Sequence, residues 1–381
     1  MEINTKTKAG LISIVRVLHR LWISGPASRA TLARELELDK STLTKVCGRL
    51  VDAGIIHRMY EGRVSSKGGR RPSLLEINPK KGSVAGIEIQ PDRVTICYTD
   101  LRGRLLAENA WDMQPEERSI QTILARTSEG FRPAVEGVPV IGAGIGIPGI
   151  IDTADGTILR STPLHIDSLY PLAQEMEKLF KLPVVCDNDA NCCAWGGLFG
   201  IPELAEKSSF TALLGDQRST GLSTGFSFVL GNEEVYHGRA YSAGEFRSVY
   251  CPEGGDRQFS VQARIPCSLS GHQAPADTLE ELCRNTAFLV NILNLEAVVV
   301  AGTLVKDQAS FTRKLQQEIR RNWIYPPAPE CAVYCAPGGK QAVAFGAAAL
   351  FLRKLCQVPS LSRTGSGYDG SLLRRVFGTV L

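Results

Sequence analysis

The chain has 381 residues, 44% hydrophobic and 22% charged, which excludes a single small domain and allows two or three domains with sizeable cores. No apolar run is long enough to span a bilayer and no charged-then-apolar leader follows Met1, so we expect a cytoplasmic protein without a membrane partner. The net charge of +4 is uneven, because residues 1–80 carry 15 Lys and Arg against 7 Asp and Glu, a basic head that is typical of nucleic-acid-binding modules.

The first expected element is a helix from Ala9 to Ile23. Apolar residues recur there at helical spacing, and Gly25-Pro26 ends the run. Ser28 then caps a short helix from Arg29 to Glu35. The residues of this second helix that we expect to face inward are Ala30, Leu32 and Ala33.

A third helix begins after Asp39, which caps it, and ends at Gly54. Two short helices joined by a tight turn are typical of a helix-turn-helix, whose second helix enters the major groove of DNA. A solvated basic face is the alternative on charge alone. The residues that we expect to contact DNA from these helices are Arg29, Lys40, Ser41, Thr42, Thr44, Lys45 and Arg49.

The next stretch indicates a winged variant. Ile55 to Tyr60 is expected to be a strand, Glu61 to Gly69 a loop, and Ser73 to Ile77 a returning strand. Arginines in such a wing suit the narrow, electronegative minor groove of A·T-rich DNA, although a solvated linker between domains is an equal alternative. The basic residues that we assign to the wing are Arg63, Lys67, Arg70 and Arg71.

After Ser83 the pattern changes to strands with interspersed helices, which indicates an α/β body. Helices are expected from Pro171 to Phe180 and from Cys192 to Leu198. The expected strands are Val84 to Ile89, Arg93 to Thr99, Arg104 to Glu108, Val138 to Ile147 and Pro183 to Cys186.

Six motifs in succession along this body resemble the ROK family (repressors, open reading frames, kinases), in particular its repressor branch, which includes the N-acetylglucosamine and xylose repressors. They lie at 144–152, 188–191, 220–225, 243–245, 291–302 and 344–348. The resemblance implies a two-lobed actin-like, ribonuclease-H-like, ATPase-type fold behind the winged helix-turn-helix. We expect a DNA-binding domain at 1–78, a first lobe at 79–190 joined by a C-terminal helix at 340–381, and a second lobe at 191–339.

The resemblance also implies a sugar site between the lobes. In the family's kinases the aspartate of the Asn-Asp-Ala-Asn motif is the general base, and Asp189 stands at that position beside Asn188. A carboxylate binds sugar hydroxyls equally well without chemistry, so both residues fit a sensor, and Glu245 resembles the second sugar-binding carboxylate. The plainer alternatives are that residues 187–191 only cap a helix and that Glu245 is an ordinary surface residue.

The nucleotide loops depart from the kinase pattern. Where the kinases place Asp-x-Gly-Gly-Thr, this chain has Glu88-Ile89-Gln90-Pro91-Asp92, which removes a backbone donor and adds a carboxylate. The second loop is reduced to residues 219–225. We therefore expect no nucleotide cofactor and no kinase activity, with Asp189 a vestigial base.

The family's structural zinc is also not expected. Ser248 stands where the family has a histidine, and Cys251 is the one cysteine at the position of its three-cysteine cluster. The scattered cysteines, for example Cys97, Cys186 and Cys283, are interpreted as reduced core thiols. His165 and His237 could reach the cleft, but lone histidines are more often structural.

The sequence therefore favours a transcriptional regulator, and specifically a repressor of carbohydrate metabolism. Its expected partners are a double-stranded DNA operator and a sugar or sugar-phosphate effector. We expect a homodimer or homotetramer, because operators of helix-turn-helix proteins have two-fold symmetry. Two alternatives stay open: an active ATP-dependent sugar kinase with an appended DNA-binding domain, and a ligand-independent DNA-binding protein with a vestigial cleft.

Overall fold

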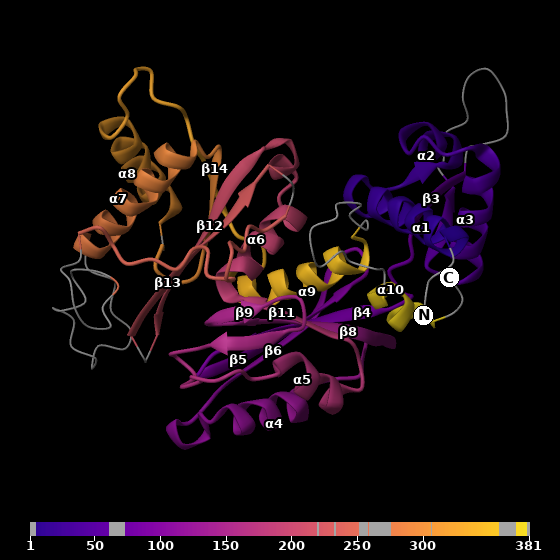
Figure 1. Cartoon of the computed structure of the whole chain (residues 1–381), viewed down its shortest axis with the longest axis horizontal. Coiled ribbons are helices and arrows are strands. Elements are labelled where there is room, and N and C mark those ends of the chain that lie inside the picture. The colour runs from indigo at the N-terminus through magenta and orange to yellow at the C-terminus, as the bar shows by residue number, and fades with distance from the viewer. Residues whose placement is uncertain are drawn as a thin grey trace.

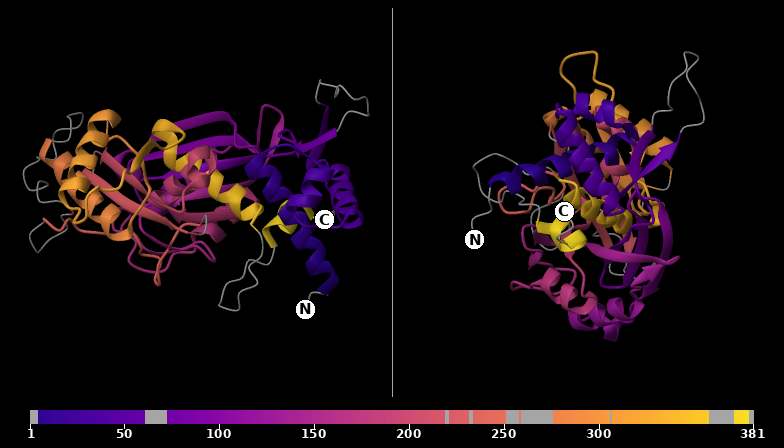
Figure 2. Two further views of the ribbon diagram at one scale, coloured as in Figure 1. Left: turned by 90° about the horizontal axis from the view of Figure 1, so that it is seen from above. Right: turned by 90° about the vertical axis from the view of Figure 1, so that its right-hand side faces the viewer.

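A computed structural model of the chain describes residues 5–60, 73–218, 221–231, 234–250, 258, 276–305, 307–357 and 371–378. The basic head and a layer formed by the helices α7 (Ala276–Leu293) and α8 (Gln308–Arg321) lie at opposite ends of the long axis (Figures 1 and 2). None of the described helices combines the length and the apolar character needed to cross a membrane.

The head has the helices and the sheet of a winged helix-turn-helix. A three-stranded sheet in the order β1-β3-β2 packs against three helices. The helices are α1 (Thr5–Ser24), α2 (Arg29–Glu35) and α3 (Lys40–Asp52), and the strands are β1 (Ala27–Ser28), β2 (Ile56–Tyr60) and β3 (Ser73–Ile77).

The predicted caps of the two short helices are confirmed. The Ser28 side chain accepts the Thr31 N–H at 3.1 Å, and Asp39 accepts the N–H groups of Ser41 and Thr42 at 2.9 and 2.8 Å. The inward orientation predicted for Ala30 is wrong, because Ala30 is exposed. It lies two residues, or about 200° of helix rotation, before the buried Leu32.

The body contains two sheets. The first has the order β11-β8-β4-β5-β6, with β4, β8 and β11 parallel and β5 antiparallel to both its neighbours. Its strands are β4 (Ser83–Ile89), β5 (Arg93–Asp100), β6 (Leu105–Asp112), β7 (Ala134–Val135), which pairs with β8, β8 (Val138–Ile147) and β11 (Val184–Asn188). Helices α4 (Ile120–Gly130) and α5 (Leu172–Phe180) cover one face, and α9 (Ala342–Leu355) covers the other (Figure 1).

The second sheet has the order β13-β12-β14-β15. Its strands are β12 (Ser209–Arg218), β13 (Gly221–Leu230), β14 (Ala297–Ala301) and β15 (Ala332–Cys335). Helices α7 (Ala276–Leu293) and α8 (Gln308–Arg321) cover its outer face, and α6 (Asp189–Gly200) covers the inner one. Helices α6 and α9 therefore lie against each other between the two sheets, as expected for a two-lobed actin-like body.

The remaining elements are short. They are the hairpin β9 (Ile150–Asp152) and β10 (Thr157–Arg160), the single turns η1 (Pro115–Glu117), η2 (Pro202–Glu206) and η4 (Gly339–Gln341), and α10 (Ser371–Phe377). Within residues 340–357 and 371–378, the described parts of the C-terminal range 340–381, there are two helices, α9 and α10, where we expected one. Leu355 is the last residue of α9, and Cys356 caps it.

The head and the body share one hydrophobic core. Buried residues of α1 and α3 belong to the same cluster as residues of β4, α9 and α10. Trp22 of α1 stacks on Phe199 near the end of α6, with ring centroids 4.7 Å apart. Beside this contact a cavity of about 830 Å³ is lined by residues of both parts, among them Lys80, Arg104 and Glu136.

Candidate functional site

Helix α3 presents most of the predicted DNA-contacting side chains to solvent. Lys40, Ser41, Thr44, Lys45 and Arg49 are exposed, and Thr42 is half-buried. The opposite face of α3, with Leu43, Val46, Cys47 and Leu50, is buried in the core of the head. An amphipathic helix that points lysine and arginine outward has the charge needed at a phosphate backbone.

Some of these groups already have partners in the head. The Ser41 hydroxyl donates to Asp39 at 2.7 Å, and the Thr44 hydroxyl donates to the Lys40 carbonyl at 2.7 Å. The hydrogen bonds from Thr42 and Ser41 hold the pKa of Asp39 well below its usual value. Lys40, Lys45 and Arg49 are therefore the side chains of α3 that these hydrogen bonds leave available to contact DNA.

Arg29 differs from the other predicted contacts. It is half-buried at the start of α2 and lies against the Cys47 thiol of α3. Burial raises the pKa of Cys47, and Arg29 offsets part of that rise. Arg29 thus connects α2 to α3, a role that the sequence did not suggest.

The wing residues Arg63, Lys67, Arg70 and Arg71 lie outside the described part of the chain. The strands on either side of them form an antiparallel pair, in which Tyr60 is opposite Ser73. The end of β2 and the start of β3 therefore lie side by side, as the two strands beside a wing must.

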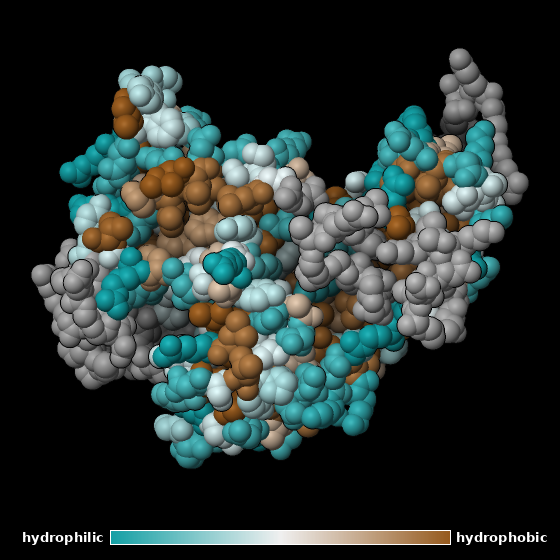
Figure 3. Space-filling model, in the orientation of Figure 1, coloured by the Kyte–Doolittle hydropathy of each residue, from teal (hydrophilic) through white to brown (hydrophobic). Residues whose placement is uncertain are grey.

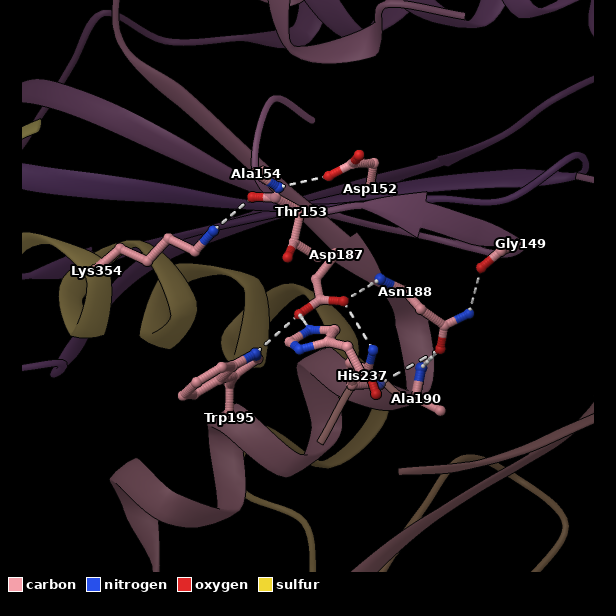
Figure 4. Close-up of polar contacts among 11 residues, drawn as sticks. Gly149, Asp152, Thr153, Ala154, Asp187, Asn188, Ala190, Trp195, His237 and Lys354 are labelled. Atoms are coloured by element: carbon pink, nitrogen blue, oxygen red, sulfur yellow. Dashed lines mark hydrogen bonds and ion pairs between the residues drawn. The ribbon is translucent and has the colours of Figure 1, made fainter. Parts of the chain in front are cut away.

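The predicted sugar residues Asn188 and Asp189 lie where β11 meets α6. The Asn188 side chain accepts the N–H groups of Ala190 and Asn191 and donates to the Gly149 carbonyl at 2.9 Å (Figure 4). Asn188 is thus the N-cap of α6, as the plainer interpretation of this motif held. A second amide hydrogen of Asn188 still has the capacity to meet a ligand.

Asp189 is almost fully buried, and one of its oxygens already has a side-chain donor. Gln90, in the turn after β4, donates from Nε2 to Asp189 Oδ2 at 3.0 Å, and both side chains are buried. In the sequence, Gln90 differs from the residue expected in a phosphate loop. We did not predict its contact with Asp189, because the two residues are 99 positions apart in the chain.

The structure brings Glu245 into the neighbourhood of Asp189. Glu245 is exposed, yet enough protein surrounds its carboxyl group that partial desolvation raises its pKa, and the charge of Asp189 raises it further. The preceding Gly244 has φ +95°, and a Cβ there would lie 1.8 Å from the Phe226 carbonyl oxygen. Only glycine fits this turn, which explains the Gly-Glu pair in the motif.

Asp187 is a buried residue that the sequence analysis did not select. Its Oδ1 accepts Asn191 Nδ2 at 2.8 Å, and its Oδ2 accepts Trp195 Nε1 at 3.0 Å and His237 Nε2 at 2.9 Å (Figure 4). Burial alone raises the pKa of Asp187, but the charge of His237 and these hydrogen bonds outweigh it and lower the pKa. Conversely, although burial lowers the pKa of His237, Asp187 raises it above its ordinary value.

The residues at the family's zinc position do not fit a metal ion in the described part of the chain. Ser248 is buried, and its hydroxyl oxygen accepts Asn285 Nδ2 at 3.0 Å and the Tyr250 N–H at 3.2 Å. Among the described residues no three His, Cys, Asp or Glu side chains are grouped to hold a metal, and Cys251 lies outside them.

The nine described cysteines are free thiols, eight of them buried.

Two family models match the chain. One, described as ROK family, matches residues 84–254, and another, described as MarR family, matches residues 13–60. A protein of Caldicellulosiruptor sp. strain Rt8B.4 named "Putative xylose repressor" is 32% identical over 79% of this chain and 84% of its own length. The Escherichia coli K12 transcriptional dual regulator NagC is 23% identical over 71% of this chain and 62% of its own length.

Solved structures support the same fold. A ROK family transcriptional regulator described as a homologue of the Escherichia coli MLC protein covers 97% of this chain and 99% of its own, with a TM-score of 0.74 at 22% identity. A Streptomyces griseus ROK glucokinase covers 71% of this chain and 99% of its own, with a TM-score of 0.55 at 22% identity. The chain belongs to the ROK family, with a MarR-type helix-turn-helix ahead of its body.

Proposed function

We propose that the chain is a DNA-binding repressor of sugar metabolism whose body binds a sugar or sugar phosphate without phosphorylating it. The exposed Lys45 and Arg49 of α3, ahead of a ROK body that places Asp189 near Glu245, are the observation that carries the proposal. Relatives named as repressors support the DNA-binding role. Double-stranded DNA and a small carbohydrate are the proposed partners, and the cytoplasm is the proposed location.

The turn after β4 favours binding over phosphoryl transfer. Where the family's kinases have a glycine of the phosphate loop, this chain has Gln90, whose buried amide donates to Asp189 Oδ2. Pro91 follows Gln90 and lacks the backbone N–H that a phosphate loop uses. Phosphoryl transfer is the alternative function, since kinases share the fold.

Helix α6 offers a route from the ligand site to the head. Its first residue is Asp189, and Phe199 near its other end stacks on Trp22 of α1. A ligand that binds one arrangement of the two sheets better than another shifts the population toward that arrangement and moves α6 with it. In a homodimer or homotetramer, which we also propose, this displaces the paired heads relative to the two halves of an operator.

The experiment for the DNA-binding role uses fragments of the chain's own genomic neighbourhood in a mobility-shift or anisotropy assay. We expect specific binding whose affinity falls steeply with salt, because lysine and arginine displace counterions from the phosphates. Arg70→Ala with Arg71→Ala should weaken it if the wing assignment is correct. If the protein binds none of these fragments more tightly than unrelated DNA, the proposal is contradicted.

A coupled ADP-release assay across hexoses, pentoses and N-acetylhexosamines separates sensor from kinase. We expect no turnover above that of Asp189→Asn. ATP turnover that Asp189→Asn abolishes would establish the kinase alternative instead. A thermal-shift screen with the same sugars tests the vestigial-cleft alternative, since a ligand that binds only the folded state raises the melting temperature.

A further inference from the structure

A single histidine joins the two sheets just behind the candidate ligand site. His237 follows β13 of the second sheet, and its Nε2 donates to Asp187 Oδ2 at 2.9 Å. Asp187 belongs to β11 of the first sheet and precedes Asp189 by two residues. The side chain of His237 therefore connects the segment that leads to Glu245 with β11, the strand that leads to Asp189 (Figure 4).

The backbone of His237 also shapes the turn that carries Glu245. The His237 carbonyl accepts the Ala243 N–H at 3.3 Å, which closes the loop from residue 237 to residue 243. The Gly244 carbonyl in turn accepts the Phe226 N–H of β13 at 3.4 Å. The turn is thus held from both sides, by β13 and by the loop that His237 anchors to Asp187.

Two other contacts also attach this segment, which follows β13, to neighbouring parts of the body. Glu234 accepts Gln357 Nε2 at 2.9 Å just beyond α9, and the Tyr241 side chain forms a hydrogen bond with Asp152. The first contact holds the segment at the end of α9, and the second holds it against the β9–β10 hairpin. Of the three, the contact between His237 and Asp187 is the most buried, with 21% and 1% of the two side chains exposed.

We propose that His237 is a positioning residue of the ligand site. Through Asp187 it holds the Gly244-Glu245 turn against the first sheet, in the arrangement where Glu245 and Asp189 face one ligand. The inference rests on the proposed function, because it assigns His237 a part in binding the effector. Its chemical consequence is that effector affinity depends on the protonation state of a side chain that does not touch the effector.

The charges that surround His237 set the direction of this dependence. Asp187 of β11 and Glu234 of its own segment favour the imidazolium, and Lys354 of α9, whose Nζ donates to the Thr153 carbonyl at 2.8 Å, opposes it. The Tyr241 ring lies 6.2 Å from the imidazole. The net effect raises the pKa of His237, so the charged bridge is complete in mild acid and weakens as the pH rises through that pKa.

Two substitutions separate the charge from the hydrogen bond. His237→Gln keeps a donor and removes the titration, whereas His237→Ala removes both. His165→Gln is the matched control, since His165 is exposed. The full chain is titrated calorimetrically with D-xylose, D-glucose and N-acetylglucosamine at about pH 6 and about pH 9, on either side of an ordinary or raised histidine pKa.

For any probe that binds, we expect Kd to rise about tenfold in His237→Ala and to return to within about threefold of wild type in His237→Gln. Wild type should bind more tightly at the lower pH, and His237→Gln should lose that pH dependence while His165→Gln keeps it. Unchanged affinity in His237→Ala would overturn the proposal.

A measurement without ligand tests the bridge independently. In NMR spectra of ¹⁵N-histidine-labelled protein, the resonance that disappears in His237→Gln should titrate above the ordinary histidine value, and Asp187→Asn should lower it. An ordinary or lower value would overturn the bridge whether or not a sugar binds. If wild type binds none of the sugars while His237 titrates high, the proposed function fails and the bridge stands.

Discussion

Three consecutive polar residues at the end of β11 have three different partners. Asp187 points to His237 and Trp195, Asn188 caps α6, and Asp189 meets Gln90. Alternation along the strand separates the first two side chains, and the turn into the helix redirects the third. A motif that looks like one functional unit in the sequence therefore divides into a structural anchor, a cap and a buried carboxylate that we propose binds the ligand.

The anchor residue should make stability depend on pH. Asp187→Asn leaves His237 without its anion in a buried site, and we expect a loss of about 3 kcal/mol in the free energy of unfolding at neutral pH. Because folding lowers the pKa of Asp187, its contribution is present above its unfolded pKa and is lost as the pH falls through the folded one. Urea unfolding of both proteins should show the difference shrinking below about pH 4. A difference that persists unchanged in strong acid would contradict this account.

At the scale of elements, the packing of α6 on α9 depends on close backbone approach. A Cβ at Gly346 of α9 would lie 1.8 Å from the Cys192 carbonyl oxygen of α6. The contact holds the two sheets at a fixed spacing, because each helix also packs on one of them.

We expect Gly346→Ala to destabilise the protein by about 3 kcal/mol, since the two helix backbones must separate to admit the methyl group. Gly10→Ala is the matched control, because a Cβ at Gly10 of α1 meets nothing within 4 Å and alanine favours a helix. Chemical denaturation measures both changes. Equal stabilities of the two variants would show that α6 and α9 do not pack this tightly.

The exposed face of α3 makes a separate prediction. Lys45→Ala and Arg49→Ala should each weaken operator binding and reduce the slope of log K against log salt by about one if the side chain contacts a phosphate. Arg34→Ala, an exposed arginine in the last turn of α2, is the control. Fluorescence anisotropy over a range of salt concentrations provides both quantities, and a loss confined to Arg34→Ala would move the interface to α2.

At the scale of the whole molecule, head and body form one cooperative unit. Their buried residues belong to a single cluster, and Trp22 joins them at Phe199. Calorimetry should therefore show one unfolding transition for the wild type. Trp22→Ala should cost about 3 kcal/mol and separate the head's transition from that of the body. Two transitions in the wild type would show that the shared core is too weak to couple them.

Much of the fold follows from local signals. Ser28 and Asp39 predicted the starts of α2 and α3, and Gly54 predicted the end of α3. Strands β3 and β8 have the predicted bounds. These signals act within a few residues, where hydrogen bonding and side-chain periodicity decide the backbone conformation. The two-residue β1 was missed because a strand that short is defined only by its partner β3.

The candidate site was only partly predictable. The resemblance selected Asn188, Asp189 and Glu245, but the contacts that explain them join Gln90 to Asp189 across 99 residues and Asp187 to His237 across 50. No local pattern encodes such pairs, because the first forms only when β4 and β11 join one sheet and the second only when the two sheets come together. Asp187, which follows an apolar strand and stands next to the motif, could have been selected from the sequence. Nothing in the sequence around His237 indicates that Asp187 is its partner.

Glu76 of β3 links the sheet of the head to the body, and this link bears on how freely the head can rotate relative to the body. One of its carboxylate oxygens accepts His57 of β2 at 2.7 Å, and the other accepts Arg102 of the β5–β6 turn at 3.0 Å. The head is thus held to the body by this ion pair as well as by the shared hydrophobic core around Trp22, and contacts of both kinds must break before the head can turn relative to the body. We therefore expect the head to keep its orientation on the body, so that the proposed dimer should tolerate little change in the spacing of operator half-sites.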